Sequence, residues 1–287
     1  MNCEMFISTY HDAEKFLARV QPVLLTEEVK NSLLLGIAHR LRKLPIEERV
    51  PYLATVDDEP GLLLAALMTP PFNLVLAAQG EQPDAAMLEL IQYVRVQQWP
   101  IPGVRASVPL VDHFARLWTE QTGQQAELTM RQSTFELTHV ISPPPVPGHF
   151  RQAVEADYDL LTRWTTAFIA EALNKTESED IPQATLSRIR AGDLFVWESN
   201  TGEVVSMAER TRPIVNVITI ALVYTPPELR GKGYAANCVA ALSQHLLNNG
   251  WSTCSLTTDL ANPTSNYIYQ KMGYRPVFDF NEYRFEP

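Results

Sequence analysis

The stretch TPPELRGKGYAAN (residues 225–237) places two glycines and two basic residues directly ahead of a run with helical periodicity. The preceding residues, Val217–Tyr224, are rich in β-branched and aromatic side chains, which predicts a strand. Apolar residues then recur at helical spacing between Ala235 and Leu246. The glycines therefore stand on a strand-to-helix turn, where free backbone N–H groups and the helix dipole favour an anion. This stretch predicts a phosphate-binding turn.

The chain has 287 residues and a formal net charge of −10, which argues against a nucleic-acid-binding protein. It contains neither an apolar run of about 18 residues nor a secretory signal, so we expect a cytoplasmic protein without a membrane partner. The three cysteines and six histidines show no ligand spacing, and we predict no metal site. Cys238 and Cys254 lie in periodic segments and are predicted core residues. The sequence is also compatible with a homodimer.

A proline-rich segment, SPPPVPG (residues 142–148), divides the chain almost in half and predicts a semi-rigid spacer. Residues 1–141 and 149–287 each predict the same order: helices, a three-strand meander, helix, strand, helix, strand. We interpret this as an internal duplication of an α+β fold with a mixed sheet; chance agreement is the alternative. In the first half, a helix from Glu27 to Arg42 is expected behind Thr26 as its N-cap.

The two predicted domains differ at the turn that follows the third strand of the meander. In the first half this turn, Gln79–Asp84, has one glycine, two acids and no basic residue, and it would repel a phosphate. Only the second half is therefore expected to keep an anion site.

The segment Arg230–Ala235 (RGKGYA) matches the Arg/Gln-x-x-Gly-x-Gly/Ala signature of the GNAT superfamily of N-acetyltransferases. Asn262, Tyr269 and the Gly273–Tyr274 pair also stand where this family's later helix has its asparagine, tyrosine and closing Gly-aromatic pair. Residues 150–287 thus resemble a GNAT domain, and the whole chain resembles a tandem GNAT protein with a degenerate first half. Two motifs in the expected order are stronger evidence for this family than a glycine pattern alone.

The resemblance implies an acetyl-CoA site in the second half. The pyrophosphate would lie on the glycine turn, and the pantetheine arm would pair with the end of the preceding strand, which requires the neighbouring strands to part. Lys232 and Asn262 have alternative roles as a solvated rim residue and a simple helix cap. The cofactor-binding residues implied are Val223, Thr225, Arg230, Gly231, Lys232, Gly233, Tyr234, Ala235, Asn262, Asn266 and Tyr269.

The same resemblance implies that Tyr269 protonates the departing coenzyme A thiolate; a core tyrosine is the alternative. No acid lies within Val217–Tyr224, so Glu209 and Asp259 are the candidate bases, each with a solvated or capping role as its alternative.

The sequence thus predicts an acetyl-CoA-dependent N-acetyltransferase that acts on a primary amine of a small molecule or peptide. A non-catalytic acetyl-CoA-binding module is the alternative, and a protein whose first half recruits or covers a partner is a third. An acidic surface suggests cationic acceptors, but net charge is a poor guide to substrate. The acceptor amine is not determined by the sequence.

Overall fold

The computed structural model describes residues 4–43, 51–59, 61–80, 83–173 and 180–286. In these residues the sheet has twelve strands, in the order β1-β2-β3-β4-β5-β12-β6-β11-β10-β9-β8-β7. The N-terminal half contains β1 (Phe6–Thr9), α1 (Ala13–Leu24), η1 (Leu25–Glu27), α2 (Ser32–Leu41), β2 (Tyr52–Asp57), β3 (Leu62–Met68), β4 (Leu74–Ala78), α3 (Asp84–Val96), β5 (Gly103–Ser107), α4 (Leu110–Thr122) and β6 (Gln125–Leu137).

The C-terminal half repeats this order of elements, as the sequence predicts. It contains β7 (His149–Gln152), η2 (Glu155–Asp157), α5 (Tyr158–Leu173), α6 (Ile181–Ala191), β8 (Leu194–Glu198), β9 (Val204–Thr211), β10 (Val217–Tyr224), η3 (Pro227–Leu229), α7 (Tyr234–Asn248), β11 (Thr253–Asp259), α8 (Pro263–Lys271) and β12 (Arg275–Glu286). The four-residue edge strands β1 and β7 were not expected from the sequence, because neither has a pattern long enough to show period-two alternation.

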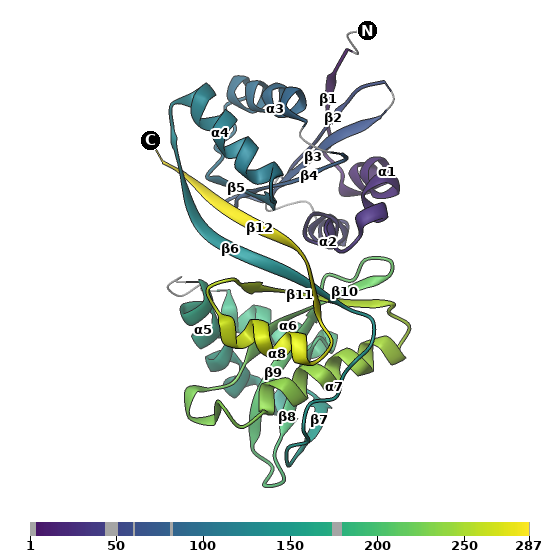
Figure 1. Ribbon diagram of the computed structural model, residues 1–287, viewed down its shortest axis with the longest axis vertical. Coiled ribbons are helices and arrows are strands. Elements are labelled where there is room, and N and C mark those ends of the chain that lie inside the picture. Colours follow the sequence, from purple (N-terminus) through teal and green to yellow (C-terminus); the bar gives the residue numbers. More distant parts are fainter. Residues whose placement is uncertain (1–3, 44–50, 60, 81–82, 174–179, 287) are drawn as a thin grey trace.

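The two halves share strands β6 and β12, which cross the molecule side by side (Figure 1). The strand β12 pairs with β6 over nearly its whole length, and its second part also pairs with β5 of the N-terminal half. The strand β6 pairs in turn with β11 of the C-terminal half through Gln132–Leu137. Each half therefore supplies one strand to the sheet of the other. The division into domains 1–141 and 149–287 stays a prediction, but the sheet does not stop at residues 142–148.

Helices cover both faces of this sheet in each half. In the N-terminal half α3 and α4 pack on one face and α1 and α2 on the other. In the C-terminal half α7 and α8 pack on one face, and α5 and α6 on the other. Cys238 and Cys254 are fully buried in the core beneath α7, which confirms the prediction for both. Among the described helices, none has the length and apolar composition needed to span a bilayer.

A buried carboxylate fixes the turn between β9 and β10 against the N-terminal half. Glu28, which is 8% exposed, accepts hydrogen bonds from the backbone N–H groups of Val215, Asn216 and Val217 at 2.9, 2.8 and 3.0 Å. Burial alone would raise the pKa of Glu28, but these hydrogen bonds outweigh it and lower the pKa below its usual value. The carboxylate is therefore charged at neutral pH and joins the two halves.

This contact also explains why the predicted cap at Thr26 is wrong. The helix α1 continues to Leu24, and the Thr26 hydroxyl donates to the carbonyl of Val23 instead of capping a new helix. The next α-helix, α2, starts at Ser32. The intervening turn brings Glu28 to the C-terminal half, and this long-range contact outweighs the local capping preference.

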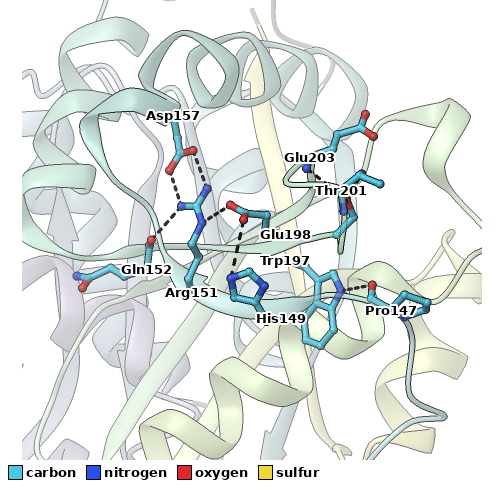
Figure 2. A network of polar contacts seen from close by, with 10 residues as sticks. Pro147, His149, Arg151, Gln152, Asp157, Trp197, Glu198, Thr201 and Glu203 are labelled. Carbon is cyan, nitrogen blue, oxygen red and sulfur yellow. Dashed lines mark hydrogen bonds and ion pairs between the residues drawn. The ribbon is translucent and has the colours of Figure 1, made fainter.

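The proline-rich segment packs against the C-terminal half. Figure 2 shows this contact at Pro147, near the end of the segment. The indole N–H of Trp197 donates to the carbonyl of Pro147 at 3.3 Å, and the amide of Asn237 donates to that of Pro144 at 3.1 Å. Val146 packs against the core beneath α7. The segment thus contacts its own half instead of spanning open solvent.

An arginine and two acids next to this segment fix β7 (Figure 2). Arg151 binds Asp157 in a bidentate pair, with contacts of 2.7 and 2.9 Å, and also donates to Glu198 at 2.6 Å. Burial alone would raise the pKa of Asp157, but Arg151 and the N–H of Val154 outweigh it and lower the pKa. Since the folded-state pKa is lowered, this pairing stabilises the protein at neutral pH, and the stabilisation is lost as the pH falls through that value.

We predict that Arg151→Met lowers the free energy of unfolding by about 2 kcal/mol at pH 7, between the values typical of exposed and buried pairs. Urea unfolding with a fluorescence readout measures this, and the difference from wild type should shrink in acid. The control is Arg190→Met, which breaks the exposed pair with Glu155 and should change little. Equal losses in both variants would contradict the role of Arg151.

A second prediction follows from the sharing of β6 and β12 between the two halves. Residues 149–287 expressed alone lack β6, which leaves β11 and β12 without the strand that lies between them. We expect this fragment to show no cooperative unfolding transition, because open edges and uncovered core are unfavourable. Co-expression with residues 1–148 should restore one transition, measured by circular dichroism. A cooperatively folded fragment 149–287 would show that β6 is dispensable.

Candidate active site

The strands β10 and β11 part near the middle of the C-terminal half. They pair only from Val217–Thr219 with Thr253–Ser255, although β10 continues to Tyr224 and β11 to Asp259. Beyond Thr219, the described residues give β10 no further partner on this side. The parting of strands that the resemblance implies is therefore confirmed, and it leaves free backbone groups along one edge of β10.

A β-bulge in β10 lies beside this opening. The register with β9 shifts between Ala221 and Tyr224, so two residues of β10, Leu222 and Val223, oppose one residue of β9. Leu222 has φ of 50°, a left-handed conformation that is unfavourable for a branched side chain. The bulge interrupts the regular ladder with β9 at Leu222 and Val223. Nothing in the local sequence signals this, because the strained position holds a leucine and not a glycine.

The chain leaves β10 through η3 and the glycine turn and enters α7. Gly231 and Gly233 have φ of 76° and 84°, which confirms that the turn needs glycine or a residue that tolerates left-handed backbone. A side chain added at Gly231 would meet no atom within 4 Å, so the turn is open at that position. The first N–H groups of α7, from Tyr234 and Ala235, have no partner within the helix. This arrangement fits a phosphate group.

Gly233 is constrained by the docked proline-rich segment as well. A Cβ at this position would lie 3.0 Å from Cγ1 of Val146, and the carbonyl of Gly233 accepts from the Asn237 amide at 3.0 Å. Replacing Gly233 would therefore disturb the protein even without a ligand, and Gly231 is the better position at which to test phosphate binding.

The side chain of Arg230 extends away from the glycine turn. Its Nε donates to the carbonyl of Thr225 at 2.8 Å, and Nη2 pairs with Glu171 of α5 at 2.6 Å. The guanidinium also lies over the ring of Tyr224, 5.7 Å from the centroid. Arg230 thus connects the end of β10 to α5, whereas Lys232 is exposed on the turn. A role for either cation at a phosphate stays a prediction.

Thr225, at the end of β10, is 8% exposed, and its hydroxyl donates to that of Ser206 at 2.9 Å. Its carbonyl is already the acceptor for Arg230. Val223, by contrast, is half-buried at the open edge. The structure therefore leaves the backbone of Val223 freer than that of Thr225 for pairing with an extended ligand.

The helix α8 begins at the predicted cap, where Oδ1 of Asn262 accepts the N–H of Ser265 at 3.1 Å. This confirms the capping role of Asn262 and leaves its contact with a cofactor a prediction. Asn266 donates to the carbonyl of Asp259 at 3.3 Å, and its Oδ1 is buried without a partner among the described residues. Asp259 also accepts the N–H of Ala261 at 2.8 Å, so its carboxylate caps this turn.

Tyr269 lies on α8 and packs edge-on against the ring of Tyr274 at 5.9 Å between centroids. Burial raises the pKa of the Tyr269 phenol to about 12, so the hydroxyl is protonated at neutral pH. No hydrogen bond of this hydroxyl occurs within the part of the chain that the structure describes. The side chain thus combines a packed ring with a hydroxyl that can donate.

Glu209 lies on the opposite face of the sheet, on the side of α5 and α6. It stands across from Ala221 of β10, immediately before the bulge, and accepts a hydrogen bond from Arg188 of α6 at 3.1 Å. Burial raises the pKa of the Glu209 carboxyl, and the nearby Arg188 opposes that shift only in part. Glu209 is therefore a carboxyl with raised basicity, although it already has a partner.

The corresponding turn in the N-terminal half has different chemistry. Gly80 is exposed with φ of 80°, and residues 81 and 82 of the predicted acidic turn lie outside the described residues. Asp84 starts α3 and pairs with His113 and Arg116 at 3.3 and 3.5 Å. A carboxylate therefore stands at the helix start where the other half has its glycine turn. In neither half do the described residues contain a cluster of three or more metal-ligating side chains.

Residues 158–274 match the model of the acetyltransferase (GNAT) family, so the C-terminal half is a GNAT acetyltransferase domain. Similar solved structures include a GNAT-family acetyltransferase from Colwellia psychrerythraea, with TM-score 0.61 and 14% identity, covering 98% of this chain and 100% of that one. A Drosophila protein gives TM-score 0.65 and 12% identity over 99% of both chains.

A tandem GNAT protein from the clavulanic acid biosynthesis pathway gives TM-score 0.58 and 10% identity over 98% of both chains. At these identities the similarity shows the fold alone: this chain has the GNAT fold, and its two-part architecture fits a tandem arrangement. A search of curated proteins found no match.

We predict that one chain binds one acetyl-CoA and that Gly231→Asp weakens this binding at least about tenfold relative to Gly231→Asn, or about 1.4 kcal/mol. Both side chains tolerate left-handed backbone and have the same size, so the difference isolates a negative charge beside the phosphates. Isothermal titration calorimetry measures affinity and stoichiometry. Gly80→Asp, at the matching exposed turn, is the control and should change nothing. Two sites per chain, or equal affinities at position 231, would contradict the prediction.

Proposed function

We propose that the protein is an acetyl-CoA-dependent N-acetyltransferase that acetylates a primary amine, with a single cofactor site in its C-terminal half. The observation that carries this is the parting of β10 and β11 beside an open glycine turn, within the half that matches the acetyltransferase family. The pantetheine arm would pair along the free edge of β10 near Val223. The pyrophosphate would accept hydrogen bonds from the turn and the first N–H groups of α7.

In the proposed reaction the amine nitrogen attacks the thioester carbonyl carbon between β10 and β11. The negative charge that develops on the carbonyl oxygen would be stabilised by a backbone N–H, for which Val223 at the bulge is the candidate. The carbon–sulfur bond then breaks, and the thiolate takes the proton of the Tyr269 hydroxyl. Solvent returns a proton to Tyr269 after the products leave.

The attacking amine must also lose a proton. Glu209 is the proposed acceptor, directly or through water, because burial raises its pKa and it stands across from β10 beside the bulge. Glu209 and Tyr269 lie on opposite faces of the sheet. A thioester held between the parted strands would therefore have the base on one side and the acid on the other.

A non-catalytic acetyl-CoA-binding module is the second candidate. It is favoured by the pairing of Glu209 with Arg188 and by the lack of any acid in Val217–Tyr224. Release of free thiol on addition of amines distinguishes the two functions, since only a transferase consumes acetyl-CoA.

We expect Tyr269→Phe to lower kcat by about 10² or more, the usual contribution of a general acid. The ring and its contact with Tyr274 remain, so acetyl-CoA affinity should change less than about tenfold. Steady-state thiol release and calorimetry measure the two quantities. Because the pKa of Tyr269 is raised to about 12, its ionisation should cause no fall in activity up to about pH 10.

The matched control is Tyr267→Phe, two residues away, because Tyr267 is 61% exposed and its ring lies beneath Lys271. It should leave kcat unchanged. Loss of stability together with activity in Tyr269→Phe would identify Tyr269 as a core residue, and unchanged kcat would assign the proton to water or to another group.

A further inference from the structure

Two arginines from different halves lie on the sheet face opposite α7 and α8, close enough for the charge of one to lower the pKa of the other. Arg105 of β5 lies on the face that carries α1 and α2, because its neighbours Val104 and Ala106 belong to the core beneath α3 and α4. It reaches Gln132 of β6 and lies 3.8 Å from Glu282 of β12. Its side chain is 26% exposed, and yet burial lowers its pKa. The side chain is thus partly accessible to solvent, although its Nε is buried.

Arg212 comes from the turn between β9 and β10 of the other half. Its backbone is left-handed, with φ of 48°, which is unusual for an arginine. The side chain lies against Gly36 of α2, where an added Cβ would come within 2.7 Å of Cβ of Arg212. A strained backbone and a glycine on the facing helix therefore hold Arg212 in place.

The positive charges of this pair are only partly compensated, because one carboxylate, that of Glu282, lies 3.8 Å from Arg105. Burial, together with the neighbouring charge of Arg105, lowers the pKa of Arg212 to about 10. Arg212 is therefore charged at neutral pH, although its surroundings make the charged form less favourable than it is in water. Within the described residues Arg212 forms no ion pair, and Nε of each arginine is buried without a hydrogen-bond acceptor. Glu209, the acid that attracts Arg212, is bound by Arg188 at 3.1 Å.

Glu282 is shared, because its Oε2 pairs with Arg105 while its Oε1 accepts a hydrogen bond from Asn73 at 3.0 Å. Buried guanidinium N–H groups without acceptors, such as the Nε of each arginine, are unfavourable, and such groups cluster where a protein binds ligands. A carboxylate or a phosphate offers the oxygen atoms that guanidinium groups bind best.

The position relates this pair to the proposed reaction. Thr211, the residue before Arg212, pairs with Thr219, the last residue of β10 that pairs with β11. The hydroxyl of Thr219 contacts that of Ser255 at 3.0 Å on the same face. Arg212 therefore lies on the Glu209 side of the sheet, close to where the strands begin to part, and not on the side of the glycine turn and α7.

We propose that Arg105 and Arg212 form an anion site between the two halves that binds a carboxylate or phosphate of the acceptor, so that the substrate is an amine carrying an anionic group. The acceptor assignment rests on the proposed function, whereas the anion site does not. It also gives the N-terminal half a part in the reaction, because Arg105 belongs to that half.

The first experiment tests the site without any acetyl transfer. Thermal unfolding of the full chain is titrated with sodium phosphate and with sodium acetate, at ionic strength held constant with sodium chloride. Wild type should be stabilised by at least one of the two anions, and its apparent Kd should rise at least about tenfold in Arg212→Gln and in Arg105→Gln. Arg210→Gln is the control, because Arg210 is two residues away and pairs with Asp193.

A second readout covers the case in which a variant is simply less stable. Without an anion, Arg212→Gln should unfold at a higher temperature than wild type, since it removes a disfavoured charge beside Arg105. A merely structural Arg212 would give the opposite sign. The site is overturned if neither anion stabilises wild type, or if Arg210→Gln weakens the response as much as Arg212→Gln does.

The acceptor is then tested by thiol release with matched amines. L-phenylalanine against 2-phenylethylamine, and L-alanine against ethylamine, report on a carboxylate, and O-phosphoethanolamine against ethanolamine reports on a phosphate. An anionic member should have a kcat/KM at least about tenfold higher than its neutral partner, and Arg212→Gln should remove the difference through KM.

Equal or better turnover of the neutral amines would overturn the acceptor assignment while the proposed acetyltransferase stands. Anion binding that depends on Arg212, together with no thiol release from any amine, would overturn that assignment and the proposed function alike and leave the anion site.

Discussion

The antiparallel pairing of β6 with β12 is the contact on which the remaining structure depends. These strands come from opposite halves of the chain, and each continues into the sheet of the other half. Backbone hydrogen bonds along nearly their whole length make the two halves one sheet, which a proline-rich segment alone would not do. The hydrogen bonds from the backbone N–H groups of Val215–Val217 to the Glu28 carboxylate then fix the turn that carries Arg212. The geometry between the halves is therefore set by buried contacts.

The halves repeat one order of elements but carry different chemistry at the same place. In the C-terminal half an open, basic glycine turn follows the third strand of the meander, whereas the N-terminal half has Asp84 at the start of its helix. An anion would be attracted to the first and repelled by the second. On the proposed function, the N-terminal half serves as a wall of the acceptor site, through Arg105, and not as a second catalytic unit.

Part of the local geometry of the candidate site could be predicted because its residues lie in two short motifs. The glycine turn and the cap of α8 depend on local backbone preferences, which adjacent residues determine, and both are confirmed. Other features depend on contacts between distant residues and gave no signal. The bulge at Leu222 is one example, and the contact of Val146 with Gly233 is another. The partner of Arg230 lies on α5, so its side chain extends away from the turn that its sequence position suggests.

The sequence by itself determined the α+β class, the repeated order of elements, the buried cysteines and the motifs of an acetyltransferase domain. Hydrophobic periodicity and glycine or capping preferences act over a few residues, so they can be read directly. Only the tertiary structure decided that β6 and β12 are shared and that Thr26 is not a cap. It also decided that Arg105 and Arg212, far apart in the sequence, come close enough for the charge of one to lower the pKa of the other. Such pairings depend on how strands are ordered in the sheet, and local patterns carry no information about that order.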